Sequence, residues 1–206
     1  MAAVVRPGMT VVDIGANLGY FTLLLADLVG ESGQVHAFEP NPAMTTRLRR
    51  TISVNGFGAR TTVHQVALSD SDGGQADLII PADEPKNAHI VPAAGPPRPT
   101  GLRLSTRRLD SFDELAEADF IKIDADTAEE AIWRGASGLL RSRRPLTIFL
   151  EFAPARYADP DGFLQAIGAA GFQLNWIRFH GGMQPATPSE ILAGSPLDDR
   201  MLALRR

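Results

Sequence analysis

One turn near the start of the chain restricts the possible folds more than any other feature. Residues 11–26 read VVDIGANLGYFTLLLA, in which one apolar run passes through a glycine-containing turn into a second apolar run. The β-branched Val11, Val12 and Ile14 suit a strand that is covered on both faces, as in a parallel sheet. In the second run, leucines and Phe21 recur at helical spacing. The sequence therefore predicts a buried strand followed directly by a helix.

The residues of this turn also suit a ligand site. Gly15 and Gly19 permit a tight turn and let a ligand approach the backbone, while free amides at the start of the helix favour an anionic or carboxylate group. The same glycines would also allow a helix to pack closely on a strand, so the turn alone favours neither interpretation.

Strand and helix patterns alternate along most of the chain. Further strands are predicted at residues 34–38, 61–68, 120–124, 146–152, 172–179 and 201–205. Helix starts are predicted at Asn41-Pro42, at Pro160 and at Thr127-x-x-Glu130, which has the form of a capping box. This alternation implies a parallel sheet with right-handed crossovers.

Two segments interrupt the alternation. Six prolines crowd residues 70–108 around the strand-like ADLII and LRLST, which predicts an inserted, extended hairpin-like segment. Residues 180–199 are rich in Gly, Pro and Ser and are predicted to form a long loop. With 206 residues, 44% of them hydrophobic, the chain is expected to form one domain over residues 1–206.

Acidic residues lie at or just before the ends of four predicted strands, at Asp13, Glu39, Asp124 and Glu151. Open parallel sheets bind ligands outside the carboxyl ends of their strands. Glu39 lies 20 residues after Gly19, the spacing at which an acid after the second strand accepts ribose hydroxyls. The sequence therefore predicts a ligand that contains a nucleoside.

The form of the turn distinguishes two such ligands. The dinucleotide fingerprint reads G-x-G-x-x-G, whereas Asn17 holds the second glycine position here and the third glycine is absent. S-adenosylmethionine contains ribose and adenine without phosphate, and its ammonium suits an acid such as Asp13. We therefore expect S-adenosylmethionine as the cofactor. A NAD-dependent oxidoreductase is the alternative, although no Tyr/Lys catalytic pair is evident.

Several motifs together carry a family resemblance. VVDIGANLGYFT, HAFEPNP, VALSD, RRLDSF, DFIKIDADTAEEAIWRGASGLL and TIFLEF follow in this order. Over roughly residues 8–205 the chain resembles the FkbM family of class I S-adenosylmethionine-dependent methyltransferases. The resemblance implies a Rossmann-like α/β fold with a mostly parallel seven-stranded sheet, an antiparallel final strand and helices on both faces. It also implies O-methylation of a small-molecule acceptor, with the hydroxyl on a natural product or a sugar.

The resemblance implies roles for single residues as well. The cofactor-binding set comprises Asp13, Gly15, Asn17, Gly19 and Tyr20 near the methionine half, Glu39 and Pro40 near the ribose, Val66 and Ala67 near the adenine, and Asp124. The family usually reads K-I-D-V-E-G-A-E where this chain reads K-I-D-A-D-T-A-E. Asp126 thus stands where the family has glutamate and has a shorter acidic side chain. Thr127 stands where the family has glycine and lacks the backbone freedom of glycine. This departure indicates altered specificity or reduced activity, while Thr127 is also interpreted as the helix cap.

Methyl transfer to oxygen requires positioning and removal of the acceptor's proton. The candidate catalytic residues are Asp124, His180 and Glu151. Asp124 is the best placed of the three, although a purely orienting role suits it equally well. No metal is expected, and if one binds, its ligands are predicted to be Asp124, Asp126 and Glu151. The strand residues His36 and His64 are interpreted as structural.

Composition argues against other classes. A net charge of −4 gives no footprint for non-specific nucleic-acid binding. The absence of cysteine excludes disulfides, thiolate metal sites and the nucleophile of cytosine-carbon methylation. Without a signal peptide or a membrane-length apolar run, we expect a cytoplasmic protein with no nucleic-acid or membrane partner. A cofactor-binding or partner-binding module without transferase activity is the non-enzymatic alternative. The sequence does not predict the acceptor's identity or the oligomeric state.

Overall fold

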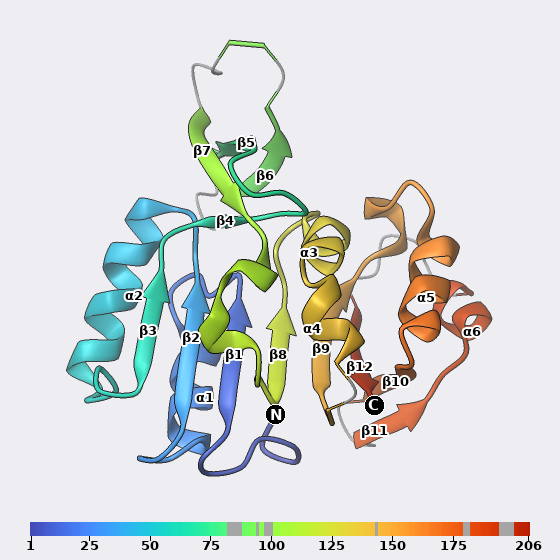
Figure 1. Cartoon of the computed structure of the whole chain (residues 1–206), viewed down its shortest axis with the longest axis horizontal. Coiled ribbons are helices and arrows are strands. Elements are labelled where there is room, and N and C mark those ends of the chain that lie inside the picture. The colour runs from blue at the N-terminus through green and yellow to red at the C-terminus, as the bar shows by residue number, and fades with distance from the viewer. Residues whose placement is uncertain (82–87, 94, 97–100, 143, 179–181, 194–199) are drawn as a thin grey trace.

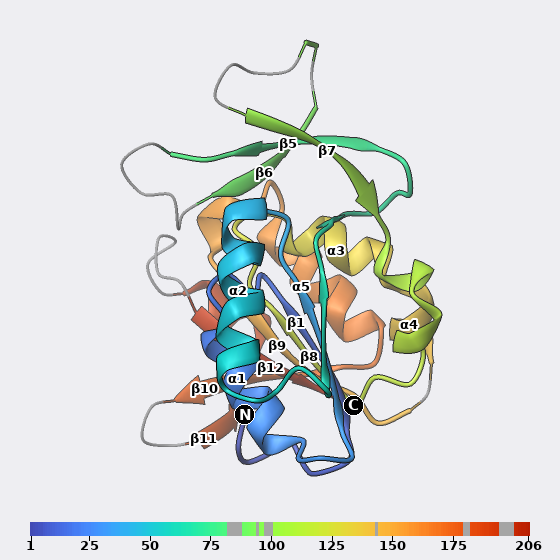
Figure 2. The same ribbon diagram turned by 90° about the vertical axis from the view of Figure 1, so that its left-hand side faces the viewer.

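The central layer of the molecule is a mixed sheet covered by helices on both faces (Figures 1 and 2). The computed structural model describes residues 1–81, 88–93, 95–96, 101–142, 144–178, 182–193 and 200–206. The sheet has eight strands in the order β11-β10-β12-β9-β8-β1-β2-β3. Their bounds are β1 (Thr10–Ile14), β2 (Gln34–Phe38), β3 (Thr61–His64), β8 (Phe120–Ile123), β9 (Thr147–Phe152), β10 (Gln173–Arg178), β11 (Gly182–Pro185) and β12 (Arg200–Arg205).

Strand direction follows the prediction from the sequence. β3, β2, β1, β8 and β9 pair in parallel, whereas β12 runs antiparallel between β9 and β10. The Rossmann-like class I methyltransferase arrangement with an antiparallel final strand is therefore confirmed. The strand count differs by one, because β11 adds an eighth strand to the free edge of β10.

The prediction of a loop over residues 180–199 is wrong for its described part. β11 pairs antiparallel with β10, because an edge strand presents unpaired backbone groups that a following segment can bond. α6 (Pro188–Leu192) then begins at a capping box in which Thr187 and Glu190 bond each other's backbone amides. Residues 180, 181 and 194–199 lie outside the described residues.

The other α-helices are α1 (Tyr20–Leu28), α2 (Pro42–Val54), α3 (Glu129–Gly135), α4 (Ser137–Arg141) and α5 (Pro160–Ala169). Two of the predicted helix starts are confirmed. Asn41 accepts a hydrogen bond from the Ala43 amide at the start of α2, and Asp159 accepts one from the Gly162 amide at the start of α5. In both helices proline occupies the first helical position, where its missing N–H costs nothing.

A second, smaller sheet stands above the carboxyl ends of the parallel strands (Figure 1). Its four strands pair in the order β4-β7-β5-β6. Their bounds are β4 (Ala67–Leu68), β5 (Gln75–Ile79), β6 (His89–Pro92) and β7 (Gly101–Arg107). The predicted strand over 61–68 is thus divided between the two sheets. Two short 3-10 helices, η2 (Leu109–Ser111) and η3 (Asp113–Leu115), lead from β7 back to β8, and a third, η4 (Pro154–Arg156), follows β9.

The largest apolar cluster packs between the central sheet and helices α3 to α5. It includes the aromatic side chains Phe38, Trp133, Phe152, Phe163 and Phe172. Burial of such side chains contributes about 1.5–3 kcal/mol each, which fixes the helices on this face. In the part of the chain that the structure describes, no helix has both the length and the apolar character that a membrane span requires.

Candidate functional site

A pocket of about 380 Å³ opens at the carboxyl ends of β1, β2 and β8, with β6 of the second sheet on its other side. Its wall includes the turn after β1, the end of β2, the link between β3 and β4, and the turn after β8. This is the place where open α/β sheets bind ligands.

The turn after β1 is held in a conformation that requires glycine. Gly15, Asn17 and Gly19 have φ angles of 75°, 50° and 94°, in the left-handed region that glycine and asparagine tolerate. A Cβ atom on Gly15 would lie 1.7 Å from the carbonyl oxygen of Asp124. The amides of Gly15 and Ala16 donate to the carbonyl oxygen of Phe38 at 3.1 and 3.0 Å. The turn therefore packs directly against the ends of β2 and β8.

Glu39 connects the first two strand ends. Its Oε2 accepts a hydrogen bond from the Asn17 amide and its Oε1 accepts one from the Asn41 amide, both at 2.8 Å. The side chain is buried yet contributes to the pocket wall. Burial raises the pKa of Glu39, and the two amide bonds oppose that rise. Since each carboxylate oxygen accepts more than one hydrogen bond, both can still accept hydroxyl groups from a ligand.

A buried lysine links β1 to β8. Lys122 Nζ lies 3.3 Å from Asp13 Oδ1 and 3.1 Å from Asp124 Oδ2. Burial opposes its charge, but the two carboxylates outweigh that effect and raise the pKa of Lys122. Asp13 Oδ2 also accepts a hydrogen bond from Thr22 Oγ1 at 2.6 Å, and the side chain is fully buried. Asp13 therefore lies beneath the turn, whereas Lys122 and Asp124 reach the pocket wall.

The turn after β8 also contains left-handed residues, although it has no glycine. Asp126 and Thr127 have φ angles of 43° and 86°. The capping box predicted at Thr127 is wrong, because α3 begins at Glu129 after Ala128 and has no side-chain cap. The left-handed backbone at Thr127 separates this residue from the helix start.

A second buried glutamate holds the turn after β8. Glu129 Oε1 accepts a hydrogen bond from the Ala125 amide at 3.0 Å, and its Oε2 accepts one from the Tyr157 hydroxyl at 3.2 Å. Burial raises the pKa of Glu129, and hydrogen bonds from backbone amides, including that of Ala125, oppose the rise. Glu129, the first residue of α3, thus binds a backbone amide of the turn that precedes the helix.

Acids and one arginine lie beside each other at the ends of β8 and β9. Ile123 and Leu150 are the last residues that pair between β8 and β9. Asp124 and Glu151 come directly after them in the chain and are therefore neighbours. Burial chiefly, and then the charge of Asp124, raise the pKa of Glu151 to about 7, while Arg156 opposes the rise.

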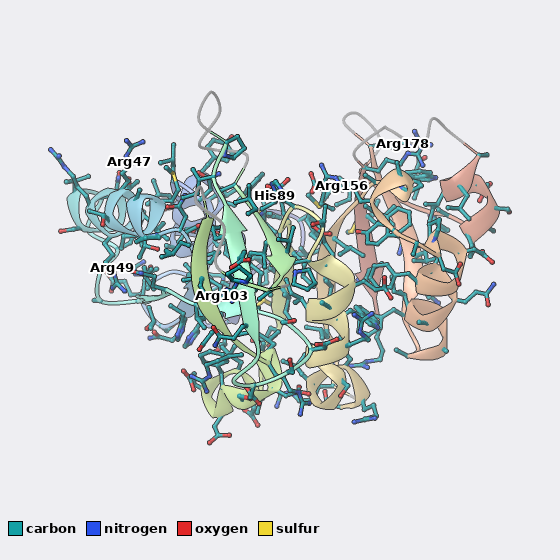
Figure 3. All side chains as sticks on the ribbon, turned by 90° about the horizontal axis from the view of Figure 1, so that it is seen from above. Arg47, Arg49, His89, Arg103, Arg156 and Arg178 are labelled. Carbon is teal, nitrogen blue, oxygen red and sulfur yellow. The ribbon has the colours of Figure 1, made fainter. Side chains whose placement is uncertain are left out.

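Arg156 joins the two acid-bearing segments. Its Nη1 lies 2.5 Å from Glu151 Oε2 and its Nη2 lies 3.9 Å from Asp126 Oδ1. Figure 3 looks down on this face and shows Arg156 across from His89 of β6. A metal held by Asp124, Asp126 and Glu151 would have to compete with Arg156 and Lys122 for these carboxylates.

The predicted site residues divide into three groups. Those in the pocket wall are Gly15, Asn17, Tyr20, Glu39, Pro40, Val66, Asp124 and Asp126. Four others are outside the wall but next to it: Gly19 and Ala67 adjoin wall residues in the chain, Asp13 pairs with Lys122, and Glu151 lies beside Asp124. The candidate His180 lies outside the described residues. Their assigned roles stay predictions.

Some residues of the wall were not predicted. Lys122 had a signal in the sequence, since a lysine within the apolar run FIKI requires an acidic partner if the strand is buried. Ala88, just before β6, and Ile90, within β6, had no such signal in the sequence, because they reach the pocket only through the folding of the second sheet.

The chain is similar to methyltransferases in sequence. Residues 13–174 match the family model for the methyltransferase FkbM domain. The 31-O-demethyl-FK506 methyltransferase FkbM of Streptomyces tacrolimicus is 42% identical, over 98% of this chain and 82% of that protein. Other relatives are matched over less of their length. The chain spans 23% of a tRNA wybutosine-synthesizing protein 2 homolog of Danio rerio and 56% of a protein-L-isoaspartate O-methyltransferase of Aeropyrum pernix, at 37% and 26% identity over 48% and 83% of this chain.

The fold is similar to that of solved methyltransferases. A methyltransferase FkbM from Methylobacillus flagellatus superposes with a TM-score of 0.57 at 17% identity, over 98% of this chain and 48% of that one. An O-methyltransferase from Bacillus cereus in complex with SAH gives 0.53 at 19% identity, over 96% and 74%. At these identities the likeness shows the fold.

Proposed function

This chain belongs to the FkbM family of methyltransferases, and on that premise we propose that it transfers a methyl group from S-adenosylmethionine to a hydroxyl group of a small molecule. The observation that carries the proposal is Glu39, buried in the pocket wall with both oxygens fixed by backbone amides. A natural product or a sugar is the proposed acceptor class. The family match does not favour the two alternatives, a NAD-dependent oxidoreductase and a non-catalytic binding module.

The pocket fits the proposed cofactor. A volume of about 380 Å³ is within the usual range for small-molecule sites. Glu39 offers one remaining acceptor position on each oxygen, which suits the two hydroxyls of a ribose. Phe38, Met44 and Val66 supply apolar wall for the adenine, and Gly15 and Asn17 of the turn after β1 also line the pocket.

S-adenosylmethionine, when bound, supplies an electrophilic methyl group. The chain's own residues then have to position the acceptor hydroxyl, exclude water and accept its proton. We assign the proton to the neighbouring carboxylates Asp124 and Glu151. A base works best when its pKa is near the working pH, and the pKa of Glu151 is about 7. Asp124 brings this pair into the pocket wall.

The rim of the pocket supports a small organic acceptor. Tyr20 and Leu18 are 78% and 47% exposed, and Ile90 contributes apolar surface from β6. These groups suit the apolar face of a natural product or a sugar ring. The Streptomyces tacrolimicus relative is named for the methylation of 31-O-demethyl-FK506, which supports an oxygen acceptor. The net charge of −4 does not favour RNA as acceptor.

Isothermal titration tests the cofactor. We expect S-adenosylmethionine and S-adenosylhomocysteine to bind and NAD not to bind. Glu39→Ala should weaken binding at least about 100-fold, because it removes two hydrogen bonds to a charged group, worth about 1.5–3 kcal/mol each. Glu117→Ala is the control, since the Glu117 side chain is 78% exposed and outside the pocket wall. Folding of each variant is checked by circular dichroism. Absence of binding to either sulfur nucleoside would contradict the proposal.

The pH dependence of methyl transfer tests the carboxylate pair, once an acceptor has been found by screening with and without EDTA. In the wild type, kcat should rise as the pH passes about 7, because Glu151 loses its proton there. Glu151→Gln should abolish this rise. Asp124→Asn should move it to lower pH, because the charge of Asp124 raises the pKa of Glu151. A profile that neither variant changes would exclude the pair as the base.

A further inference from the structure

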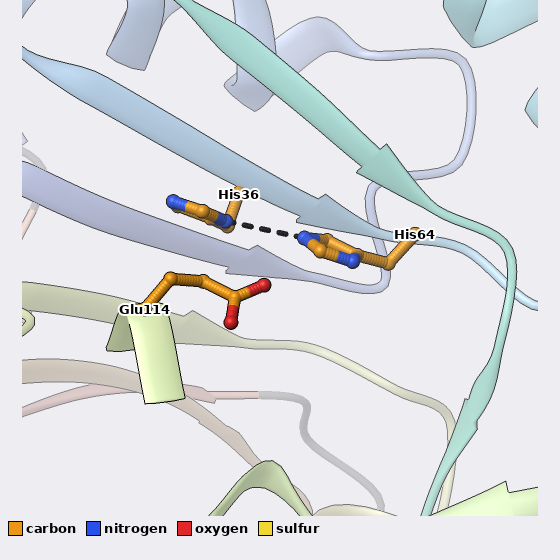
Figure 4. Close-up of side chains that lie close together, drawn as sticks. All are labelled: His36, His64 and Glu114. Carbon is orange, nitrogen blue, oxygen red and sulfur yellow. Dashed lines mark hydrogen bonds between the residues drawn. The ribbon is translucent and has the colours of Figure 1, made fainter. Parts of the chain in front are cut away.

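Two histidines and a glutamate that do not line the pocket meet on one face of the central sheet. His36 lies in β2, His64 in β3 and Glu114 in η3. In the β2–β3 register, His36 lies opposite Thr62 and Phe38 lies opposite His64, so both imidazoles project from the same face. His36 Nδ1 and His64 Nε2 are 3.1 Å apart. Figure 4 shows the Glu114 carboxylate facing both rings.

The distances suit a shared metal ion. One ligand atom from each of the three side chains lies within 4.8 Å of the others. With metal–nitrogen distances of about 2.0–2.1 Å, ligand atoms of a tetrahedral site lie about 3.4 Å apart. The two imidazole nitrogens are already close to that separation. Glu114 is exposed, so its carboxylate can adjust without disturbing the core.

We propose that His36, His64 and Glu114 bind a divalent transition-metal ion, of which zinc is the best match. Two imidazole nitrogens with one carboxylate oxygen are ligands that zinc accepts, and the fourth position is left to water. Magnesium and calcium prefer oxygen ligands and do not match this set. The sequence analysis interprets both histidines as structural, and the proposal adds metal binding to that role.

Neighbouring side chains hold the imidazole of His64 in place. Its ring stacks on Phe38 at a centroid distance of 4.4 Å and meets the edge of Phe112 at 5.2 Å. Such support reduces the conformational entropy that a metal ligand loses on binding. Without metal, one of the two facing nitrogens, His36 Nδ1 or His64 Nε2, carries the proton of their 3.1 Å hydrogen bond. When both nitrogens bind metal, that proton has to move to the other nitrogen of the same ring.

The proposed metal would stabilise the structure and would not take part in methyl transfer. It would join β2, β3 and η3, which are far apart in the sequence. Phe38, which stacks on His64, also contributes to the pocket wall. Metal binding should therefore stabilise the fold and limit motion of that wall, with no ligand shared between metal and cofactor.

Cobalt binding to the whole 206-residue chain tests the site. Protein treated with EDTA and dialysed is titrated with Co²⁺, whose tetrahedral complexes absorb in the visible range, and then with Zn²⁺ as competitor. We expect one Co²⁺ per chain, its displacement by Zn²⁺ and a higher melting temperature with Zn²⁺. Glu114→Gln and His64→Gln should each weaken binding at least about 10-fold, since even residues behind the ligands cost 10–100-fold when changed.

Two control variants make the result specific. Glu117→Gln changes another exposed carboxylate of the same segment, which pairs with Arg144, and should leave Co²⁺ binding unchanged. Asp124→Asn tests whether the acids at the pocket bind the ion instead. No binding by the wild type, or binding that survives both Glu114→Gln and His64→Gln, would overturn the proposal. So would loss of binding in Asp124→Asn alone. None of these measurements depends on methyl transfer, so the proposal can fail or stand independently of the proposed function.

Discussion

Two neighbouring turns of the pocket wall require the same backbone conformation but have different residues. The turn after β1 has Gly15, Asn17 and Gly19 in left-handed conformations, at φ 75°, 50° and 94°. The turn after β8 has Asp126 and Thr127 there, at 43° and 86°. Glycine and asparagine tolerate this region, whereas a β-branched residue is strained by about 1–3 kcal/mol. The first turn has residues suited to its conformation, and the second has its conformation imposed by its surroundings.

The surroundings that impose it are visible in the structure. Each turn donates one amide to a buried glutamate, from Asn17 to Glu39 and from Ala125 to Glu129. Each glutamate is fixed by another bond as well, to the Asn41 amide for Glu39 and to the Tyr157 hydroxyl for Glu129. The two turns together indicate that a buried, hydrogen-bonded carboxylate can hold a left-handed turn in place even where the residues of the turn disfavour that conformation.

The largest expected effect comes from a change in the first turn. Gly15→Ala places a Cβ atom 1.7 Å from the Asp124 carbonyl oxygen and also strains a φ of 75°. We expect the free energy of unfolding to fall by about 3 kcal/mol or more, measured by denaturant titration. Gly56→Ala is the matched control, because Gly56 has a φ of 76° with no atom within 4 Å of a Cβ, and should cost about 1 kcal/mol. Equal losses in the two variants would show that the contact between the turns is unimportant.

The second effect concerns the glutamate of the other turn. Glu129→Ala leaves the Ala125 amide without its acceptor and leaves the Tyr157 hydroxyl with only its 3.4 Å bond to the Glu151 carbonyl oxygen, which should cost about 2 kcal/mol of unfolding free energy. Tyr157→Phe removes the hydroxyl alone and should cost about 1 kcal/mol. If Glu129→Ala were no worse than Tyr157→Phe, Glu129 would not hold the turn.

A smaller effect of opposite sign is expected from Thr127→Gly. The substitution relieves strain at φ 86°, while glycine loses more backbone entropy on folding. The two terms leave a net gain of about 1 kcal/mol, visible as a higher melting temperature. Asn17→Gly, at a position that already tolerates the left-handed region, should not gain stability. A lower melting temperature for Thr127→Gly would show that the second turn is not strained.

A further effect is a change in the pH dependence of stability. The folded-state pKa of Glu151, about 7, lies above its ordinary value of 4.5. The contribution of Glu151 is therefore complete below about pH 4.5 and is lost as the pH rises through 7. In melting experiments between pH 5 and pH 8, the wild type should lose stability relative to Glu151→Gln. A constant difference between the two proteins across this range would contradict the raised pKa.

The sequence by itself determined which residues form most of the strands and where the candidate site lies. Apolar periodicity located the parallel strands, and the glycine turn with Glu39 20 residues after Gly19 located the end of the sheet at which the pocket opens. The FkbM family resemblance is confirmed by the match over residues 13–174. These features could be predicted because each depends on residues close together in the chain, or on a spacing that the parallel sheet repeats.

Only the tertiary structure decided which distant residues meet. It gave Lys122 two acidic partners, brought Ile90 of β6 to the pocket and put Glu114 beside His36 and His64. It also made the capping box at Thr127 wrong, and paired β11 with β10 where a loop was predicted. Such contacts depend on strand order and on how loops pack across strand ends. Local propensity has no information about either, because the interacting groups lie tens of residues apart and meet only after the sheets have formed.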